Sequence, residues 1–164
     1  MTTYKSGSLI ADRYEVVSNP LMGGMGIVYL CFDLSEEIPV ALKTFKKEFL
    51  SNRDIRSRFL KEGNIWVQLG KHSNIVQCYQ IESIPETGEI FFILELIPKE
   101  EGRMDASLRS WLFPGRRLPI EQALLFSLQI VRGMKYATTK FPGLIHRDLK
   151  PENLLIGTNK ILNG

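Results

Sequence analysis

Short apolar runs separated by turn-forming residues dominate the first half of the chain, a pattern that is typical of β-strands. The first three runs lie at 14–17, 27–32 and 40–45, and the links between them are polar or contain glycine. Two more runs lie at 75–81 and 90–96, on either side of a Pro-Glu-Thr-Gly-Glu turn. Because the early links are short, the first three runs predict an antiparallel meander.

A helix is predicted between the third and fourth strands. Ser51 and Asp54 fit the S/T-x-x-D/E capping pattern at its start. Four apolar residues then fall within one arc of about 80° on a helical wheel: Ile55, Phe59, Trp66 and Leu69. Glu62 lies inside that arc, where a carboxylate without a partner is costly. The pattern therefore predicts a cation beside Glu62, and Lys43 is the candidate.

The chain after residue 98 predicts mainly helices. Residues 98–103 are polar and contain a proline and a glycine, as in a linker. A short helix is expected at 106–113 and a longer one at 120–139, with Pro119 at its start. The longer helix is apolar around most of its circumference, so we expect it to be buried on several sides, to associate or to expose an apolar surface. The remainder is expected to be mostly loop.

Composition narrows the class of protein. The chain has 164 residues, of which 44% are hydrophobic and 24% charged, as in a folded globular protein with a sizeable core. The net charge of +3 is too small to indicate nucleic acid or an anionic membrane as a partner. Cys31 and Cys78 support neither a disulfide framework nor a zinc site. With no membrane segment and no leader expected, a cytoplasmic location is the default prediction.

The most specific string is His-Arg-Asp-Leu-Lys-Pro-Glu-Asn at 146–153. Asp148 could accept a proton from a hydroxyl nucleophile, and Lys150 could place positive charge beside a phosphoryl group. Asn153 offers a neutral oxygen that suits Mg²⁺. A polar surface turn is the alternative, but a chance match over eight successive residues is rare. The string resembles the catalytic loop of eukaryotic-type serine/threonine protein kinases.

That resemblance implies roles for these residues and for an earlier strand. Asp148 is implied as the catalytic base, Lys150 as a contact to the γ-phosphate of ATP, and Asn153 as a metal ligand. Val-Ala-Leu-Lys at 40–43 resembles the third-strand motif of the family. Lys43 is thereby implied to approach the α- and β-phosphates while paired with Glu62.

The glycine-containing link at 19–26 resembles the loop that covers the phosphates in this family. Aligned through Gly26 and Val28, the second glycine of the pattern is Gly23, whereas Leu21 occupies the position of the first. The Gly-Gly-Met-Gly string is similar to that of bacterial members. A plain hairpin turn is the alternative explanation for these glycines.

Residues 91–97 resemble the fifth strand and hinge of the family. The resemblance implies Leu94 as the gatekeeper, and Glu95 and Ile97 as residues whose backbone groups contact adenine. Three apolar residues are implied to surround the adenine ring: Val28, Ala41 and Leu155. Taken singly, each of these is equally consistent with ordinary core.

The resemblance covers about residues 9–162 and implies an α+β, protein-kinase-like fold. A five-stranded antiparallel small lobe with one long helix is expected at 1–98, and the first helices and catalytic loop of an incomplete helical large lobe at 99–164. The D-F-G motif would follow 160–162, where the sequence ends, so weak or no activity is expected of this chain.

The leading interpretation is a bacterial-type kinase that transfers the γ-phosphoryl group of Mg-ATP to serine or threonine hydroxyls of a protein substrate. A catalytically inactive nucleotide-binding or scaffolding module is one alternative. A non-functional remnant of a disrupted gene is the other.

Overall fold

The computed structural model describes residues 4–23, 26–45, 49, 52–112 and 115–157, and it divides into two compact units. The first unit contains Met1–Lys71 and Gln77–Leu96, and the second contains His72–Val76 and Ile97–Gly164. The sequence placed one boundary near residue 98, whereas the structure also assigns the short segment His72–Val76 to the second unit. Within the described ranges, no helix combines the length and apolar character needed to cross a bilayer.

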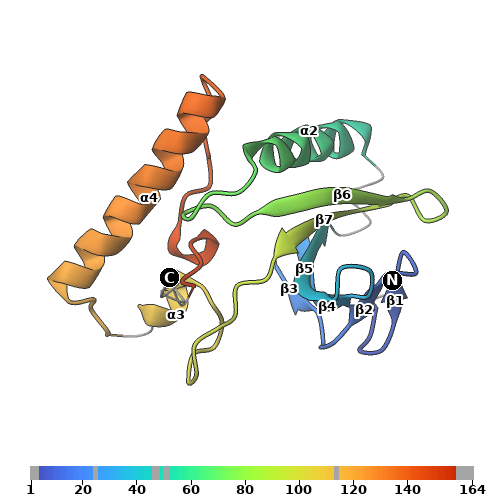
Figure 1. Cartoon of the computed structure of the whole chain (residues 1–164), viewed down its shortest axis with the longest axis horizontal. Coiled ribbons are helices and arrows are strands. Elements are labelled where there is room, and N and C mark those ends of the chain that lie inside the picture. The colour runs from blue at the N-terminus through green and yellow to red at the C-terminus, as the bar shows by residue number, and fades with distance from the viewer. Residues whose placement is uncertain (1–3, 24–25, 46–48, 50–51, 113–114, 158–164) are drawn as a thin grey trace. The chain divides into compact units, whose positions relative to one another are not determined.

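The first unit is built on an antiparallel sheet with the order β1-β2-β4-β5-β7-β6, in which β3 pairs with β4 (Figure 1). Its strands are β1 (Leu9–Ile10), β2 (Tyr14–Val16), β3 (Leu21–Met22), β4 (Gly26–Asp33), β5 (Ile38–Phe45), β6 (Cys78–Ile84) and β7 (Glu89–Glu95). All five predicted strands are present, and β1 and β3 are short additions. The start of the fourth predicted strand is wrong, because residues 75–77 precede β6.

Strand alternation creates a core on one face of this sheet. Along β4 every second side chain from Ile27 to Cys31 is buried, and Val40 and Leu42 on β5 face the same way. The ring of Tyr4 packs edge-on against Tyr29, with 5.6 Å between ring centroids. Each large apolar side chain that is removed from water here contributes about 1.5–3 kcal/mol. The period-2 pattern therefore fixes which side chains remain for the opposite face.

The helix α2 (Arg53–Leu69) lies along β6, against the opposite face of the sheet (Figure 1). Phe59 stacks on Phe92 of β7 with 3.9 Å between ring centroids. The N-cap is Asn52, whose side chain accepts hydrogen bonds from the backbone N–H groups of the second and third residues after it. The predicted cap, Ser51, lies outside the described residues, and the helix starts one residue after Asn52.

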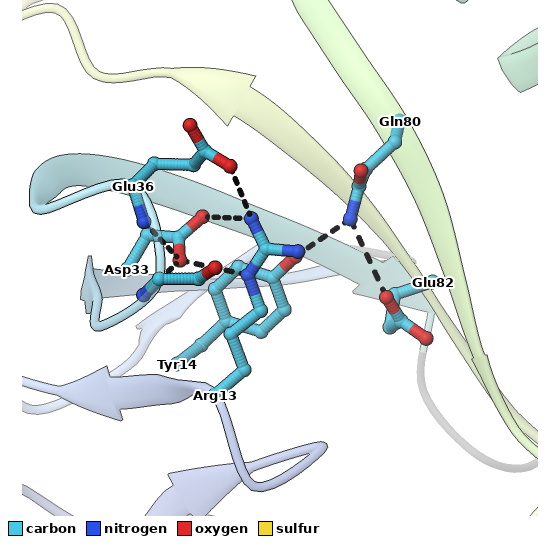
Figure 2. Close-up of polar contacts among 7 residues, drawn as sticks. Arg13, Tyr14, Asp33, Glu36, Gln80 and Glu82 are labelled. Carbon is cyan, nitrogen blue, oxygen red and sulfur yellow. Dashed lines mark hydrogen bonds and ion pairs between the residues drawn. The ribbon is translucent and has the colours of Figure 1, made fainter.

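A polar cluster ties the first strands to the rest of the sheet. Figure 2 shows the Arg13 guanidinium bound to both carboxylate oxygens of Asp33, at 2.7 and 2.8 Å. Glu36 lies 3.6 Å from the same guanidinium. In the same view, the amide of Gln80 donates to the hydroxyl of Tyr14 at 2.8 Å. These bonds connect β2, the β4–β5 turn and β6.

The second unit contains α3 (Leu108–Trp111), α4 (Ile120–Lys140) and the short 3₁₀ helix η1 (Pro151–Asn153). The C-terminal half of α4 packs against the segment His72–Val76, where His72 stacks on Tyr136 with 4.4 Å between ring centroids. A Cβ at Gly133 would lie 2.6 Å from the backbone oxygen of Asn74, so this close approach requires glycine. The expected apolar surface on α4 is present, with five side chains at least 46% exposed: Ile120, Leu124, Leu125, Leu128 and Val131.

Candidate functional site

The α2-facing side of the sheet in the first unit brings most of the predicted nucleotide-binding residues together. Leu21, Val28 and Lys43 are successive cross-strand partners on β3, β4 and β5. In the neighbouring row, Ala41 on β5 is the direct partner of Leu94 on β7. Because direct partners share a face, these five side chains lie on the same side of the sheet.

The glycine link forms a hairpin between β3 and β4. The N–H of Gly23 donates to the carbonyl of Gly26 at 2.9 Å, and residues 24–25 between them lie outside the described part of the chain. A Cβ at Gly26 would lie 3.2 Å from the backbone oxygen of Thr44. Leu21 is 53% exposed and Met22 is 56% exposed, so the hairpin presents apolar side chains at its tip. The structure thus supports a hairpin, which both explanations of the glycines predict.

Glu62 does not point toward the sheet, so the prediction that it lies on the inward face of α2 is wrong. Its side chain is exposed, whereas Gly63 is buried and faces Phe92. On the helical wheel the inward face is centred near Phe59 and Gly63, about 80° from Glu62. A glycine adds no apolar side chain to the pattern, so the apolar periodicity does not indicate this rotation.

Lys43 accordingly has a different neighbour from the one predicted. Its ammonium lies over the ring of Trp66, 5.7 Å from the ring centroid, which is a cation–π contact. Among the described residues, no ion pair joins Lys43 to Glu62. Trp66 was predicted only as part of the apolar face, and its place on the wheel near Phe59 gave no sign of contact with Lys43.

The predicted hinge residues fall on either side of the division between the units. In the first unit Leu94 is 7% exposed. The N–H of Glu95 donates to the carbonyl of Gln77 at 2.9 Å, so only the carbonyl of Glu95 remains for the predicted backbone contact. In the second unit Ile97 is half-buried, and Leu155 is 43% exposed and forms an isolated bridge with Ser107.

The three residues predicted as catalytic converge in the second unit. The ammonium of Lys150 lies 2.8 Å from Oδ1 of Asp148. The Nδ2 group of Asn153 donates to both the backbone oxygen and Oδ2 of Asp148, each at 2.8 Å. Arg147 has φ of +62°, an uncommon conformation for a non-glycine residue, and it turns the chain immediately before Asp148. The structure brings these three residues together, and their catalytic roles stay predictions.

The contacts around Asp148 keep its carboxylate charged. The hydrogen bond from Lys150 and then the one from Asn153 lower the pKa of Asp148 below its ordinary value. The carboxylate is therefore an acceptor that can align a hydroxyl group near neutral pH. Because the Nδ2 group of Asn153 is hydrogen-bonded to Asp148, the Oδ1 atom of Asn153 is the atom that remains to bind a cation.

Contacts that the sequence did not predict hold this loop in place. The residues after η1 pair with the chain around the start of α3. The N–H of Leu108 donates to the carbonyl of Leu154 at 2.7 Å, and the N–H of Ile156 donates to the carbonyl of Ala106 at 2.8 Å. Arg109 forms an ion pair of 2.8 Å with Glu152. The partners are more than 40 residues apart, so no local pattern could have indicated them.

A dedicated metal centre is not evident in the described ranges, where no three His, Cys, Asp or Glu side chains lie close enough to bind an ion. The oxygen atoms of Asp148 and Asn153 are the ligand types that Mg²⁺ accepts. With both Asp148 oxygens already bound, Oδ1 of Asn153 is the ligand that fits a magnesium ion taking its remaining ligands from phosphate and water.

Comparisons with known proteins agree with this geometry. A family model described as "Protein kinase domain" matches residues 21–162. The chain is 30% identical over 155 residues to the serine/threonine-protein kinase PknD of Protochlamydia amoebophila, covering 90% of this chain and 15% of PknD. It is 33% identical over 158 residues to the mitogen-activated protein kinase mpkC of Aspergillus oryzae, covering 96% of this chain and 41% of mpkC.

The fold also matches a solved structure, the kinase domain of Mycobacterium tuberculosis PknI. The TM-score is 0.74 at 24% identity, and the match covers 96% of this chain and 59% of that domain. This likeness confirms the expected fold. The chain spans less than half the length of the two curated relatives, at 15% and 41%.

Proposed function

Because the chain belongs to the protein kinase domain family, we propose that it is part of a serine/threonine kinase that transfers the γ-phosphoryl group of Mg-ATP to a protein hydroxyl. The observation that carries the proposal is the cluster of Asp148, Lys150 and Asn153, joined by three contacts of 2.8 Å. The bacterial type of the sequence stays a proposal, since the bacterial PknD and the fungal mpkC match at similar identity, 30% and 33%.

Each residue of the cluster has a distinct part in the proposed transfer. The Asp148 carboxylate, kept ionised by its neighbours, accepts a hydrogen bond from the substrate hydroxyl and orients it for attack. Lys150 moves its positive charge from Asp148 to the phosphoryl oxygens as negative charge gathers there. Asn153 keeps Asp148 in place through Nδ2 and offers Oδ1 to the metal ion.

In the first unit, we propose the sheet face as the surface that binds the nucleotide. Val28, Ala41 and Leu94 provide an apolar surface for the adenine ring, and Lys43 lies on the same face as a cation for the phosphates. The glycines of the β3–β4 hairpin leave space in which a phosphate group can approach the backbone. Magnesium-bound ATP supplies the phosphoryl group and the charge neutralisation that this chemistry needs.

A nucleotide-binding module without transfer activity is the second candidate. The observation that favours it is the position of Lys43, whose ammonium lies over Trp66 while Glu62 is exposed. A lysine held by a neutral ring is fixed less strongly than one in an ion pair. Binding and transfer must therefore be tested separately.

The binding test is a thermal unfolding measurement with and without Mg-ATP. Ligand at 100 times its Kd stabilises the folded state by about 2.7 kcal/mol, so an upward shift in Tm is expected. Lys43→Met should remove most of the shift while preserving the length of the side chain. Lys61→Met is the matched control, because Lys61 is exposed on α2 and should leave the shift unchanged. No shift with millimolar Mg-ATP would contradict nucleotide binding.

The transfer test follows radiolabel from γ-³²P-ATP to serine- and threonine-containing protein. Transfer by this chain is expected to be weak, and it should fall at least about 100-fold in Asp148→Asn, because the amide cannot accept the hydroxyl proton. Binding without detectable transfer in the original chain would support the second candidate. Equal transfer by the original chain and Asp148→Asn would contradict the role of Asp148.

A further inference from the structure

An arginine-lined cavity in the second unit lies apart from the predicted catalytic residues. Its volume is about 250 Å³, and Arg103, Arg116 and Arg117 line it together with Trp111. Leu118, Pro119 and Gln122 complete the lining, so no acidic side chain faces the cavity. Three guanidinium groups around one small hollow repel one another unless an anion is present.

Like most arginines in the described part of the chain, the three cavity arginines form no ion pair with a carboxylate. Arg13 is bound to Asp33, and Arg109 is bound to Glu152. Across the described ranges, no ion pair within 4.0 Å involves any of the cavity arginines. Their hydrogen-bonding capacity toward an anion is therefore not used within the protein.

One of these arginines is held in position by aromatic packing. The guanidinium of Arg103 lies over the ring of Trp111, 4.1 Å from the ring centroid. Trp111 in turn packs edge-on against Phe126 of α4, with 5.8 Å between centroids. A stacked guanidinium keeps its in-plane N–H groups available, so Arg103 has less entropy to lose when it binds an anion.

The start of α4 adds further positive potential on the same side. Pro119 is the N-cap residue and lines the cavity, and no side chain caps this end of the helix. The first backbone N–H groups of a helix carry partial positive charge. Glu121 in the first turn offsets part of this charge, but it does not line the cavity.

We propose that Arg103, Arg116 and Arg117 form a binding site for a phosphorylated serine or threonine side chain of a protein segment. A phosphate group carries about −1.5 to −2 charges at neutral pH, and its oxygen atoms can accept hydrogen bonds from several guanidinium groups, whereas a carboxylate typically pairs with one. The cavity, at about 250 Å³, is smaller than the range of about 300–1,000 Å³ for small-molecule sites, so it suits one modified side chain. The site does not depend on the proposed transfer activity.

The test uses the full 164-residue chain and fluorescein-labelled Ala-Ala-pSer-Ala-Ala, with binding followed by fluorescence anisotropy at 50 mM salt. The same peptide without phosphate should bind at least about 10-fold more weakly, because charge-assisted hydrogen bonds are lost. Arg117→Gln and Arg116→Gln should each raise the Kd about 10-fold. Arg132→Gln, at an exposed position of α4 away from the cavity, is the matched control and should leave the Kd within about twofold.

Three results would overturn the proposal. Equal binding of the phosphorylated and unphosphorylated peptides would show that the cavity does not recognise phosphate. An effect of Arg132→Gln as large as that of Arg117→Gln would indicate diffuse charge attraction. Arginine-dependent binding to vesicles of 30% phosphatidylserine, without binding to the phosphopeptide, would assign the surface to membranes instead. Because the peptide comparison uses the unmodified chain, it decides the question even if a variant does not fold.

Discussion

Replacement of Gly63 by alanine tests the packing of α2 on the sheet. An alanine Cβ at this position would lie 2.4 and 2.6 Å from two ring carbons of Phe92, and 2.9 Å from Cδ1 of Ile81. Phe92 is fully buried and stacked on Phe59, so its ring has little room to move. The contact must be relieved by a shift of the helix or of the sheet.

Two opposing effects set the magnitude. Overpacking of a filled core costs about 1–3 kcal/mol. The change from glycine to alanine inside a helix is favourable by about 1 kcal/mol. Because two contacts fall far below ordinary separation, we expect Gly63→Ala to lower the free energy of unfolding by about 1–2 kcal/mol net. The corresponding decrease in Tm is about 4–8 °C per kcal/mol.

The assay is urea unfolding followed by the fluorescence of Trp66, with Trp111→Phe present in every variant so that the signal reports on the first unit. Asn64→Ala is the matched control, because residue 64 is exposed on the same helix and should gain a few tenths of a kcal/mol. Phe92→Leu should relieve the clash, so the double variant should be more stable than the sum of the single effects. If Gly63→Ala raised stability by about 1 kcal/mol, the packing argument would be refuted.

Three further predictions concern ionisable groups. Asp33→Asn should destabilise the chain by about 2–4 kcal/mol, because it leaves the arginine partner without a counter-charge. The pKa of Asp33 is lowered on folding, so its contribution to stability is present above about pH 4 and is lost as the pH falls through the folded pKa. Measurement of Tm across the acid range will show this loss. Burial raises the pKa of Cys31 and of Cys78 to about 12, so both thiols should resist Ellman's reagent at pH 8 until the chain is unfolded, and rapid labelling of the native chain would contradict this. Lys150→Met should raise the pKa of Asp148 toward its ordinary value in a carbon-13 NMR titration, and an unchanged value would show that the ion pair does not form in solution.

The features that the sequence predicted well depend on local spacing. Every second residue is buried along the whole of β4 and along β5 from Val40 onward, and this period is visible in the sequence. Asp148, Lys150 and Asn153 lie within six residues of one another, so a single turn can join them. Neither the strands nor the cluster depends on contacts with distant parts of the chain, so both could be predicted from local sequence.

The features that the sequence missed depend on packing between distant segments. The inward face of α2 differs from the predicted face because Gly63 leaves space for the ring of Phe92. The two residues are far apart in the sequence, so no local pattern indicates their contact. The Arg109–Glu152 pair joins residues far apart in the chain. The position of Glu62 on an apolar stripe predicted a buried ion pair. In the structure the side chain of Glu62 is exposed to solvent, so the free-energy cost of burying its charge does not arise.

The central claim is that the sheet face around Lys43 binds Mg-ATP. Hydrogen–deuterium exchange with and without Mg-ATP tests it directly, because each segment reports its own protection. We predict that exchange slows at residues 21–43 and that Lys43→Met abolishes this protection. No change in this segment at saturating Mg-ATP would contradict the claim.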